Sequence, residues 1–200
     1  MENLISALKR RYRDENVKNI AKILLLASRK GEVSFDELEM DEDEKVDTLL
    51  FLFSERLLIP KESSRTLAWE DRIIRLRPGE VYTVPNVVRN LVDIAVDTGC
   101  WNPDAAVARY LDEIGEDQAE KVLEFFKRIR NRASTLKVTK NDLTEEAEKL
   151  GLSQILSRII AEFKGAGILS PSLLDPKRFH YELNPSLLEV ERCETKQTLS

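Results

Sequence analysis

Apolar side chains recur every three or four residues along most of the chain, a spacing that buries one face of a helix. In the first third, this pattern predicts a basic amphipathic helix over 2–15, a largely apolar helix over 17–29 and another helix over about 43–57. The run Ser34-Phe35-Asp36-Glu37 fits a capping box, so a short helix is predicted to open there. Because the helix over 17–29 is apolar nearly all round, we expect it to lie at the centre of the fold.

A period of two replaces the helical spacing after residue 71. Ile74 and Leu76 alternate with arginines, and Pro78-Gly79 suits a type II turn. These features predict a β-hairpin with strands over 72–77 and 80–84.

Helical spacing returns over residues 86–115, where Gly99 and Gly115 are predicted to end two helices. Asn102-Pro103 is a strong start signal for the second of them, with asparagine as N-cap and proline at the first helical position. The order of elements then repeats. We expect a helix over 117–132, a short helix opened by Thr139 to Asp142, a turn at Gly151, and a helix capped by Ser153 and ended by Gly165 and Gly167. Strands over 168–170 and 179–183 complete the second set.

These elements divide the chain into five segments. We expect an N-terminal amphipathic helix (1–16), a unit of three helices and a hairpin (17–85), a helical connector (86–116), a second such unit (117–190) and a tail (191–200). The fold class is therefore mainly α with small β-hairpins, an α+β arrangement.

Several short runs in the second unit carry a resemblance. They are Lys140-Asn141-Asp142-Leu143, Ala147 four positions before the turn glycine, Gly151-Leu152-Ser153, Ala-Gly-Ile-Leu-Ser (166–170) and Tyr-Glu-Leu-Asn-Pro (181–185). Through them, residues 117–188 resemble the winged helix-turn-helix family. Residues 17–84 resemble the same family, with a shorter and more acidic second helix. The resemblance implies two winged-helix units joined by a helical middle segment.

In that family, the third helix often lies in the major groove while the wing touches the DNA backbone. The resemblance therefore implies that Gln154 and Arg158 read base edges, since glutamine pairs with adenine and arginine with guanine. The remaining candidate DNA contacts are polar or basic side chains on the same helix, the short helix and the wing: Ser157, Lys164, Lys140, Lys177 and Arg178. Arg128, Arg130, Arg132 and Lys137 are further candidates for phosphate contacts. A solvated polar face explains the same residues without DNA.

The third helix of the first unit has the opposite character. It begins Asp41-Glu42-Asp43-Glu44, which phosphates would repel and which stabilises a helix N-terminus. Phe51 and Leu52 fall outside its core stripe, so we expect them to contact the helical middle, a second copy in a homodimer, or a protein partner.

Composition and charge narrow the function classes. The chain has 200 residues, 42% of them hydrophobic and 34% charged, with a net charge of −5, which argues against a general polyanion binder. The charge is uneven, because residues 1–116 hold 17 Lys/Arg against 23 Asp/Glu while residues 118–181 hold 12 against 8. With one histidine and no glycine-rich phosphate loop, we expect no enzyme, no cofactor and no metal.

The cysteines and the apolar runs bear on location. Cys100 and Cys193 are far apart in sequence and outside any CxxC motif, so we expect free thiols in a reducing, cytoplasmic setting. The longest strongly apolar run, residues 20–27, is interrupted by Lys22, and no membrane partner is expected.

Two functions remain open. The first is a DNA-binding transcriptional regulator that uses the second unit on double-stranded DNA. The second is an acidic tandem winged-helix adaptor whose units bind protein partners. A regulator requires a continuous positive face joining residues 128–140, 158–164 and 177–178. In an adaptor, acidic side chains interrupt that face, and Phe51 and Leu52 are exposed.

Overall fold

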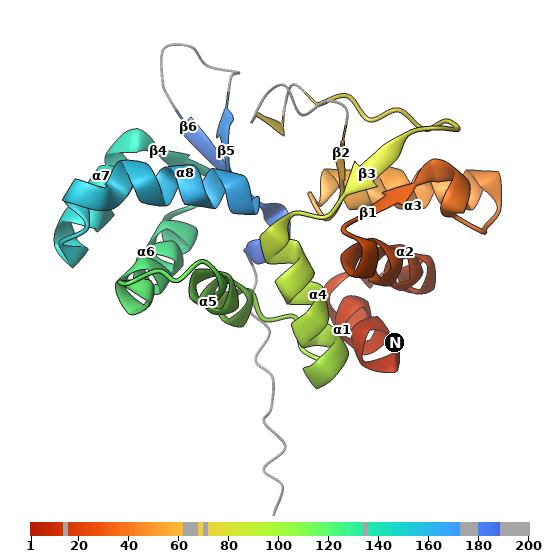
Figure 1. Ribbon diagram of the computed structural model, residues 1–200, viewed down its shortest axis with the longest axis horizontal. Coiled ribbons are helices and arrows are strands. Elements are labelled where there is room, and N and C mark those ends of the chain that lie inside the picture. Colours follow the sequence, from red (N-terminus) through yellow and green to blue (C-terminus); the bar gives the residue numbers. More distant parts are fainter. Residues whose placement is uncertain (14–15, 62–67, 70–71, 134–135, 173–179, 189–200) are drawn as a thin grey trace, which may run out of the picture.

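The computed structural model describes residues 1–13, 16–61, 68–69, 72–133, 136–172 and 180–188. It is mostly helical with two small antiparallel sheets, which confirms the α+β class. Each sheet has three strands, and the strand that comes last in the sequence lies in the middle. In Figure 1 the two sheets lie on the same side of the molecule, one on each side of the central helices.

The first part of the chain, from α2 to β3, is called repeat 1 below. With the helix that precedes it, its elements are α1 (Glu2–Arg11), α2 (Val17–Lys30), β1 (Glu32–Ser34), the 3-10 turn η1 (Phe35–Glu37), α3 (Glu42–Ser54), β2 (Ile59–Pro60) and β3 (Val81–Thr83). The strand order is β1-β3-β2, and all pairs are antiparallel.

The predicted capping box at the start of the second helix is confirmed. The Glu37 backbone N–H donates to Ser34 Oγ at 3.3 Å, and the Ser34 N–H donates to Glu37 Oε2 at 2.9 Å. The box nevertheless opens only a three-residue 3-10 turn. Asp41 already caps α3 four residues after Glu37, so there is no room for a full helix.

The predicted strand over 72–77 is wrong. The turn at Pro78-Gly79 is present, with Gly79 at φ 85°, but β3 pairs with β1 and with Ile59–Pro60 rather than with residues 72–77. The alternation is real, since Ile74 and Leu76 pack against the core while Ile73 is 72% exposed. An alternating pattern therefore identified the buried side of this segment but not the backbone partner of β3.

The helical middle forms as predicted, as α4 (Asn86–Thr98) and α5 (Pro103–Glu113). Gly99 ends α4 in the left-handed conformation at φ 74°, and the Asn102 side chain accepts the Ala105 N–H at 3.1 Å to cap α5.

The part from α6 to β6 is called repeat 2 below. Its elements, with the turn that follows, are α6 (Ala119–Arg132), β4 (Lys137–Thr139), α7 (Lys140–Leu150), the 3-10 turn η3 (Ser153–Ile155), α8 (Leu156–Ala166), β5 (Leu169–Ser172), β6 (His180–Leu183) and the 3-10 turn η4 (Pro185–Leu187). The strand order is β4-β6-β5, equivalent to that of repeat 1.

Two local predictions in repeat 2 need correction. Ser153 makes no side-chain cap and instead begins η3, because a 3-10 turn precedes α8. Gly165 lies inside α8, and only Gly167, at φ 78°, ends that helix. The opening of α7 is as predicted, with Thr139 and Asp142 forming a capping box.

The two repeats share one hydrophobic core. Its buried side chains come from every helix and both sheets. Asn184, fully buried after β6, donates to Gly167 O at 2.9 Å and to Arg56 O at 3.2 Å, so it joins the repeats. Trp101, also fully buried, donates from Nε1 to Ser186 O at 2.9 Å.

Candidate interaction surfaces

Arg158 of α8, predicted to read a base, is held by a carboxylate. Its two terminal nitrogens donate to the two oxygens of Glu116 at 2.5 and 3.0 Å. Two parallel hydrogen bonds of this kind are the strongest form of arginine–carboxylate pair. The hydrogen bonds from Arg158 hold the pKa of Glu116 below its usual range, so the pair is charged at neutral pH. The Glu116 side chain is only 2% exposed, whereas Arg158 itself is 48% exposed, so Arg158 lies at the surface with its charge matched by Glu116.

Glu146 of α7 gathers three further basic side chains. Its carboxylate, 6% exposed, lies 2.7 Å from Arg132, 2.8 Å from Lys149 and 3.6 Å from Arg128. The hydrogen bond from Lys149, together with the charge of Arg132, lowers the pKa of Glu146. The basic residues at the end of α6 thus balance an inward carboxylate.

Arg130 also points inward. Its side chain is 8% exposed, pairs with Asp104 of α5 and lies over the ring of Phe126, with its Cζ 5.1 Å from the ring centre. Removing its partner would leave a buried charge uncompensated. Arg130 therefore links α6 to α5 and does not reach a phosphate from this position.

The other predicted DNA contacts differ in exposure. Gln154, Ser157 and Lys140 are exposed, and Lys164 is half-buried. In the described part of the chain neither Lys140 nor Lys164 forms an ion pair. Lys177 and Arg178 lie outside the described residues. The structure therefore brings exposed polar groups together on α8 and η3, but Glu116 and Glu146 interrupt the expected positive face.

Phe51 and Leu52, the predicted partner surface, are used inside the molecule. Leu52 is fully buried, and Phe51 packs edge-on against Tyr12, the residue that ends α1, with ring centres 4.9 Å apart. This face of α3 therefore contacts the end of α1 in the same chain. It does not offer Phe51 and Leu52 as a free surface for a second copy or a protein partner. The exposed apolar residue on this helix is Leu50, at 43%.

Repeat 1 carries an exposed acidic segment, residues 36–47. It holds eight acidic side chains and one basic side chain: Asp36, Glu37, Glu39, Asp41, Glu42, Asp43, Glu44, Asp47 and, as the basic one, Lys45. All eight carboxylates are exposed. Within the described residues, only Glu37 forms an ion pair, with Lys30 at 2.5 Å. Among the residues that the structure describes, the acidic segment of repeat 1 thus carries negative charges without basic partners, whereas Glu116 and Glu146, which face repeat 2 arginines, are in ion pairs.

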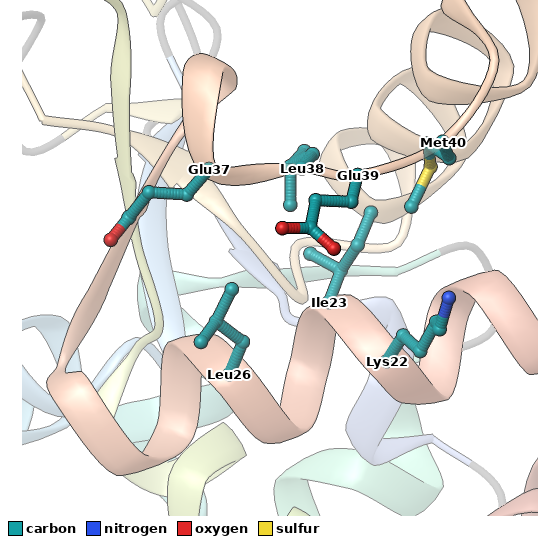
Figure 2. Close-up of a pocket in the computed structure, with 7 residues that line it drawn as sticks. All are labelled: Lys22, Ile23, Leu26, Glu37, Leu38, Glu39 and Met40. Carbon is teal, nitrogen blue, oxygen red and sulfur yellow. The ribbon is translucent and has the colours of Figure 1, made fainter.

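A groove of about 300 Å³ lies between α2 and this acidic segment. Figure 2 shows Ile23 and Leu26 rising from α2 toward the strand-like stretch that carries Leu38, Glu39 and Met40. The groove is lined by Lys22, Ile23, Leu26, Glu37, Leu38, Glu39 and Met40. It combines an apolar floor with a rim of two carboxylates and one ammonium group.

Sequence reasoning missed Glu116, Glu146 and this groove. For Glu146 a signal existed, because it lies three positions after Leu143 and beside Ala147, on the inward stripe of α7. A charged residue on a buried stripe indicates an internal ion pair. For Glu116 and the groove, no local pattern marks the site, since both depend on contacts between distant segments.

The expectation of free thiols is wrong for Cys100, which is disulfide-bonded. The only other cysteine in the sequence, Cys193, lies outside the described residues. Sequence separation misled here because the chain returns at Ser186 to Trp101, the neighbour of Cys100. The cysteine argument for a reducing, cytoplasmic setting no longer holds.

Two searches of the described residues gave negative results. No group of three or more His, Cys, Asp or Glu side chains in this part of the chain is arranged to hold a metal ion. No helix among those described is long and apolar enough to span a membrane.

The fold and these surfaces define a mainly helical α+β protein with two similar small sheets and no described metal cluster. A family model matches residues 2–193, so the chain belongs to that family over nearly its whole length. The family has no characterised activity, and membership therefore defines the extent of the related region without assigning a function. No curated protein and no solved structure matches the chain.

Proposed function

We propose that this chain is a tandem winged-helix adaptor that binds protein partners rather than DNA. The observation that carries the proposal is the neutralisation of three arginines of repeat 2. Arg158 is paired with Glu116, and Arg128 and Arg132 converge on Glu146. Binding to DNA is driven largely by counterions that are released when basic side chains neutralise phosphates. A basic side chain that is already paired with a carboxylate contributes less to this release.

The other feature expected of an adaptor, exposure of Phe51 and Leu52, is not found, because Leu52 is buried and Phe51 packs on Tyr12.

The order of elements supports the winged-helix part of the proposal. Each repeat runs helix, strand, short turn or helix, helix, strand, strand, and its last strand lies between the other two. The resemblance implies three helices followed by a hairpin. Repeat 2 has these elements and a further strand after its first helix, whereas repeat 1 has a three-residue turn in place of the second helix. The shared core supports the adaptor part, because it fixes two similar units in one orientation.

The second candidate is a DNA-binding regulator that uses repeat 2. The observation in its favour is that Gln154, Ser157 and Lys140 are exposed, as a base-reading helix and a phosphate contact require. Arg158 is also exposed, but both of its terminal nitrogens are hydrogen-bonded to Glu116, so a two-bond contact with guanine would require the pair to open.

The two candidates predict different salt dependence. Labelled random duplex DNA is titrated with the full chain while fluorescence anisotropy is recorded at low salt and near 200 mM. An adaptor gives no binding at either salt concentration. A regulator that makes about six phosphate contacts loses roughly a thousandfold in affinity between the two conditions.

Two variants make the test specific. Glu116→Gln removes the carboxylate charge opposite Arg158, and Lys18→Ala, on the exposed side of α2, is the matched control. If Glu116→Gln creates or strengthens DNA binding while Lys18→Ala does not, Arg158 is a latent DNA contact. Salt-sensitive binding by the unmodified chain that is weakened by Arg158→Ala would overturn the adaptor proposal.

A further inference from the structure

The two repeats differ at one place in a way that points to a binding site. Both close the first sheet strand with a capping box, Ser34 with Glu37 in repeat 1 and Thr139 with Asp142 in repeat 2. In repeat 2 the box opens α7, an 11-residue helix that packs on α6 and buries Leu143. In repeat 1 it opens a three-residue turn.

The described part of repeat 1 has no helix equivalent to α7, and a comparison of α2 with α6 shows which part of the α2 surface is left without a covering helix. Their inward residues follow the same spacing: Ile20, Ile23, Leu24 and Ala27 in α2, and Val122, Phe125, Phe126 and Ile129 in α6. In this alignment Leu26 takes the place of Arg128. Arg128 reaches 3.6 Å from Glu146 of α7, whereas Leu26 lines the groove of about 300 Å³. The α2 surface is thus apolar where the α6 surface pairs with a covering helix.

We propose that this groove is a docking site for a basic amphipathic helix of a partner protein. The helix would place leucine-sized side chains between Leu26 and Met40, at the four-residue spacing of Leu143 and Ala147, which are buried on α7. The proposal rests on the adaptor function above and names the chemistry of the partner.

Size and charge both fit such an occupant. A cavity of about 150 Å³ accepts one benzene, so about 300 Å³ has room for roughly two leucine-sized groups. The segment 36–47 supplies eight exposed carboxylates, of which only Glu37 is ion-paired within the described residues. Charge complementarity of this kind steers association and selects against acidic partners. Lys22 is the one basic side chain in the lining and lies on the α2 side.

The methionines allow a direct test. The chain contains two, Met40 in the groove and Met1 at the exposed N-terminus. Protein labelled with carbon-13 at the methionine methyl groups gives one reporter at the site and one internal control. The probe is a synthetic leucine–lysine peptide of about 14 residues, long enough for roughly four helical turns. A peptide with glutamate in place of lysine, and a shuffled peptide without the helical stripe, serve as matched probes.

We expect the basic amphipathic peptide to shift the Met40 signal in a saturable manner and to leave the Met1 signal in place. Glu39→Lys, an exposed reversal at the rim, should weaken binding about threefold to tenfold, as one or two surface ion pairs of up to about 1 kcal/mol each would give. Glu120→Lys, an equally exposed reversal on α6, should leave the affinity unchanged. Met40→Leu assigns the signal.

Several results would overturn the site. They are a Met40 signal that does not move at about 1 mM peptide, equal shifts with the acidic or shuffled peptide, and equal weakening by Glu39→Lys and Glu120→Lys. A Met40 shift that depends on protein concentration without peptide would show that a second copy of the chain occupies the groove. Failure of the site is distinguishable from failure of the adaptor function. If the chain does not bind DNA and the Met40 signal does not shift with peptide, only the docking site is refuted. If the chain binds DNA in a salt-sensitive manner and the Met40 signal shifts with peptide, only the adaptor function is refuted.

Discussion

Replacing Gly167 by alanine should destabilise the protein much more than the same change at Gly151. Both glycines end a helix in the left-handed conformation, at φ 78° for Gly167 after α8 and 69° for Gly151 after α7. They differ in their surroundings. A Cβ added at Gly151 meets nothing within 4 Å, whereas one added at Gly167 falls far inside van der Waals contact with Pro85 Cβ and 3.2 Å from its Cγ.

Two costs of the substitution can be separated, the left-handed backbone and the steric contact with Pro85, because Gly151 has only the first. A left-handed conformation costs an alanine about 1–2 kcal/mol. Forcing an extra methyl into a packed site costs about 1–3 kcal/mol more. Gly151→Ala should therefore lower the free energy of unfolding by about 1–2 kcal/mol, and Gly167→Ala by about 2–5 kcal/mol. For a chain of this size, each kcal/mol lowers Tm by roughly 2–4 °C.

Urea unfolding followed by circular dichroism measures both losses, and equal slopes with denaturant show that the variants unfold to the same extent. Pro85→Gly removes the opposing Cβ and should recover part of the loss in the Gly167→Ala background. Equal losses for the two glycine variants would refute the reasoning. They would mean that Pro85, just before α4, yields to the new methyl at no cost, and that the packing between repeat 2 and the start of α4 is loose.

Three other outcomes follow from buried polar contacts. The folded state holds the pKa of Glu116 below its ordinary value of 4.5, so its pairing with Arg158 stabilises the fold above that pH and this contribution is lost as the pH falls through the folded-state pKa. Between about pH 6 and 3, the free energy of unfolding should therefore fall more steeply for the unmodified chain than for Glu116→Gln. Trp101→Phe should cost about 1–3 kcal/mol in thermal unfolding, since the Ser186 carbonyl loses its buried donor; no change in Tm would contradict that bond. Asn184→Ala should cost about 2–4 kcal/mol because the buried carbonyl of Gly167 and the part-buried carbonyl of Arg56 lose their donor. A loss below about 0.5 kcal/mol would show that water replaces the amide.

The helices were predictable because their information is local. The stripe of α6 and the cap at Asn102 lie within a few residues of what they determine. The pairing of β3 was not predictable in the same way. Ile74 and Leu76 report which side of their segment faces the core, but the partner of β3 comes from Ile59–Pro60, some twenty residues earlier.

For the candidate surfaces, too, local features could be predicted from the sequence and long-range contacts could not. Exposure of Gln154 and Ser157 could be predicted from helical spacing, although the structure places Gln154 in the turn η3 and Ser157 in α8. The state of Arg158 could not, because Glu116 lies 42 positions away and its position depends on how α5, α6 and α8 pack. Counting charges along the chain gave repeat 2 a positive balance. It could not tell which of those charges are already matched.

The core shared by the repeats has a consequence for any ligand long enough to contact both of them. Repeats that share one core are expected to move together, so a first contact would place the second surface at a set distance with no further loss of rotational freedom. Two contacts that are each weak then act together, since the second occurs at a high effective concentration. A ligand whose two contact points have the wrong spacing gains nothing from the second surface. If both repeats bind a partner, as proposed above, the buried amide of Asn184 would help the protein to select ligands by the distance between their contact points.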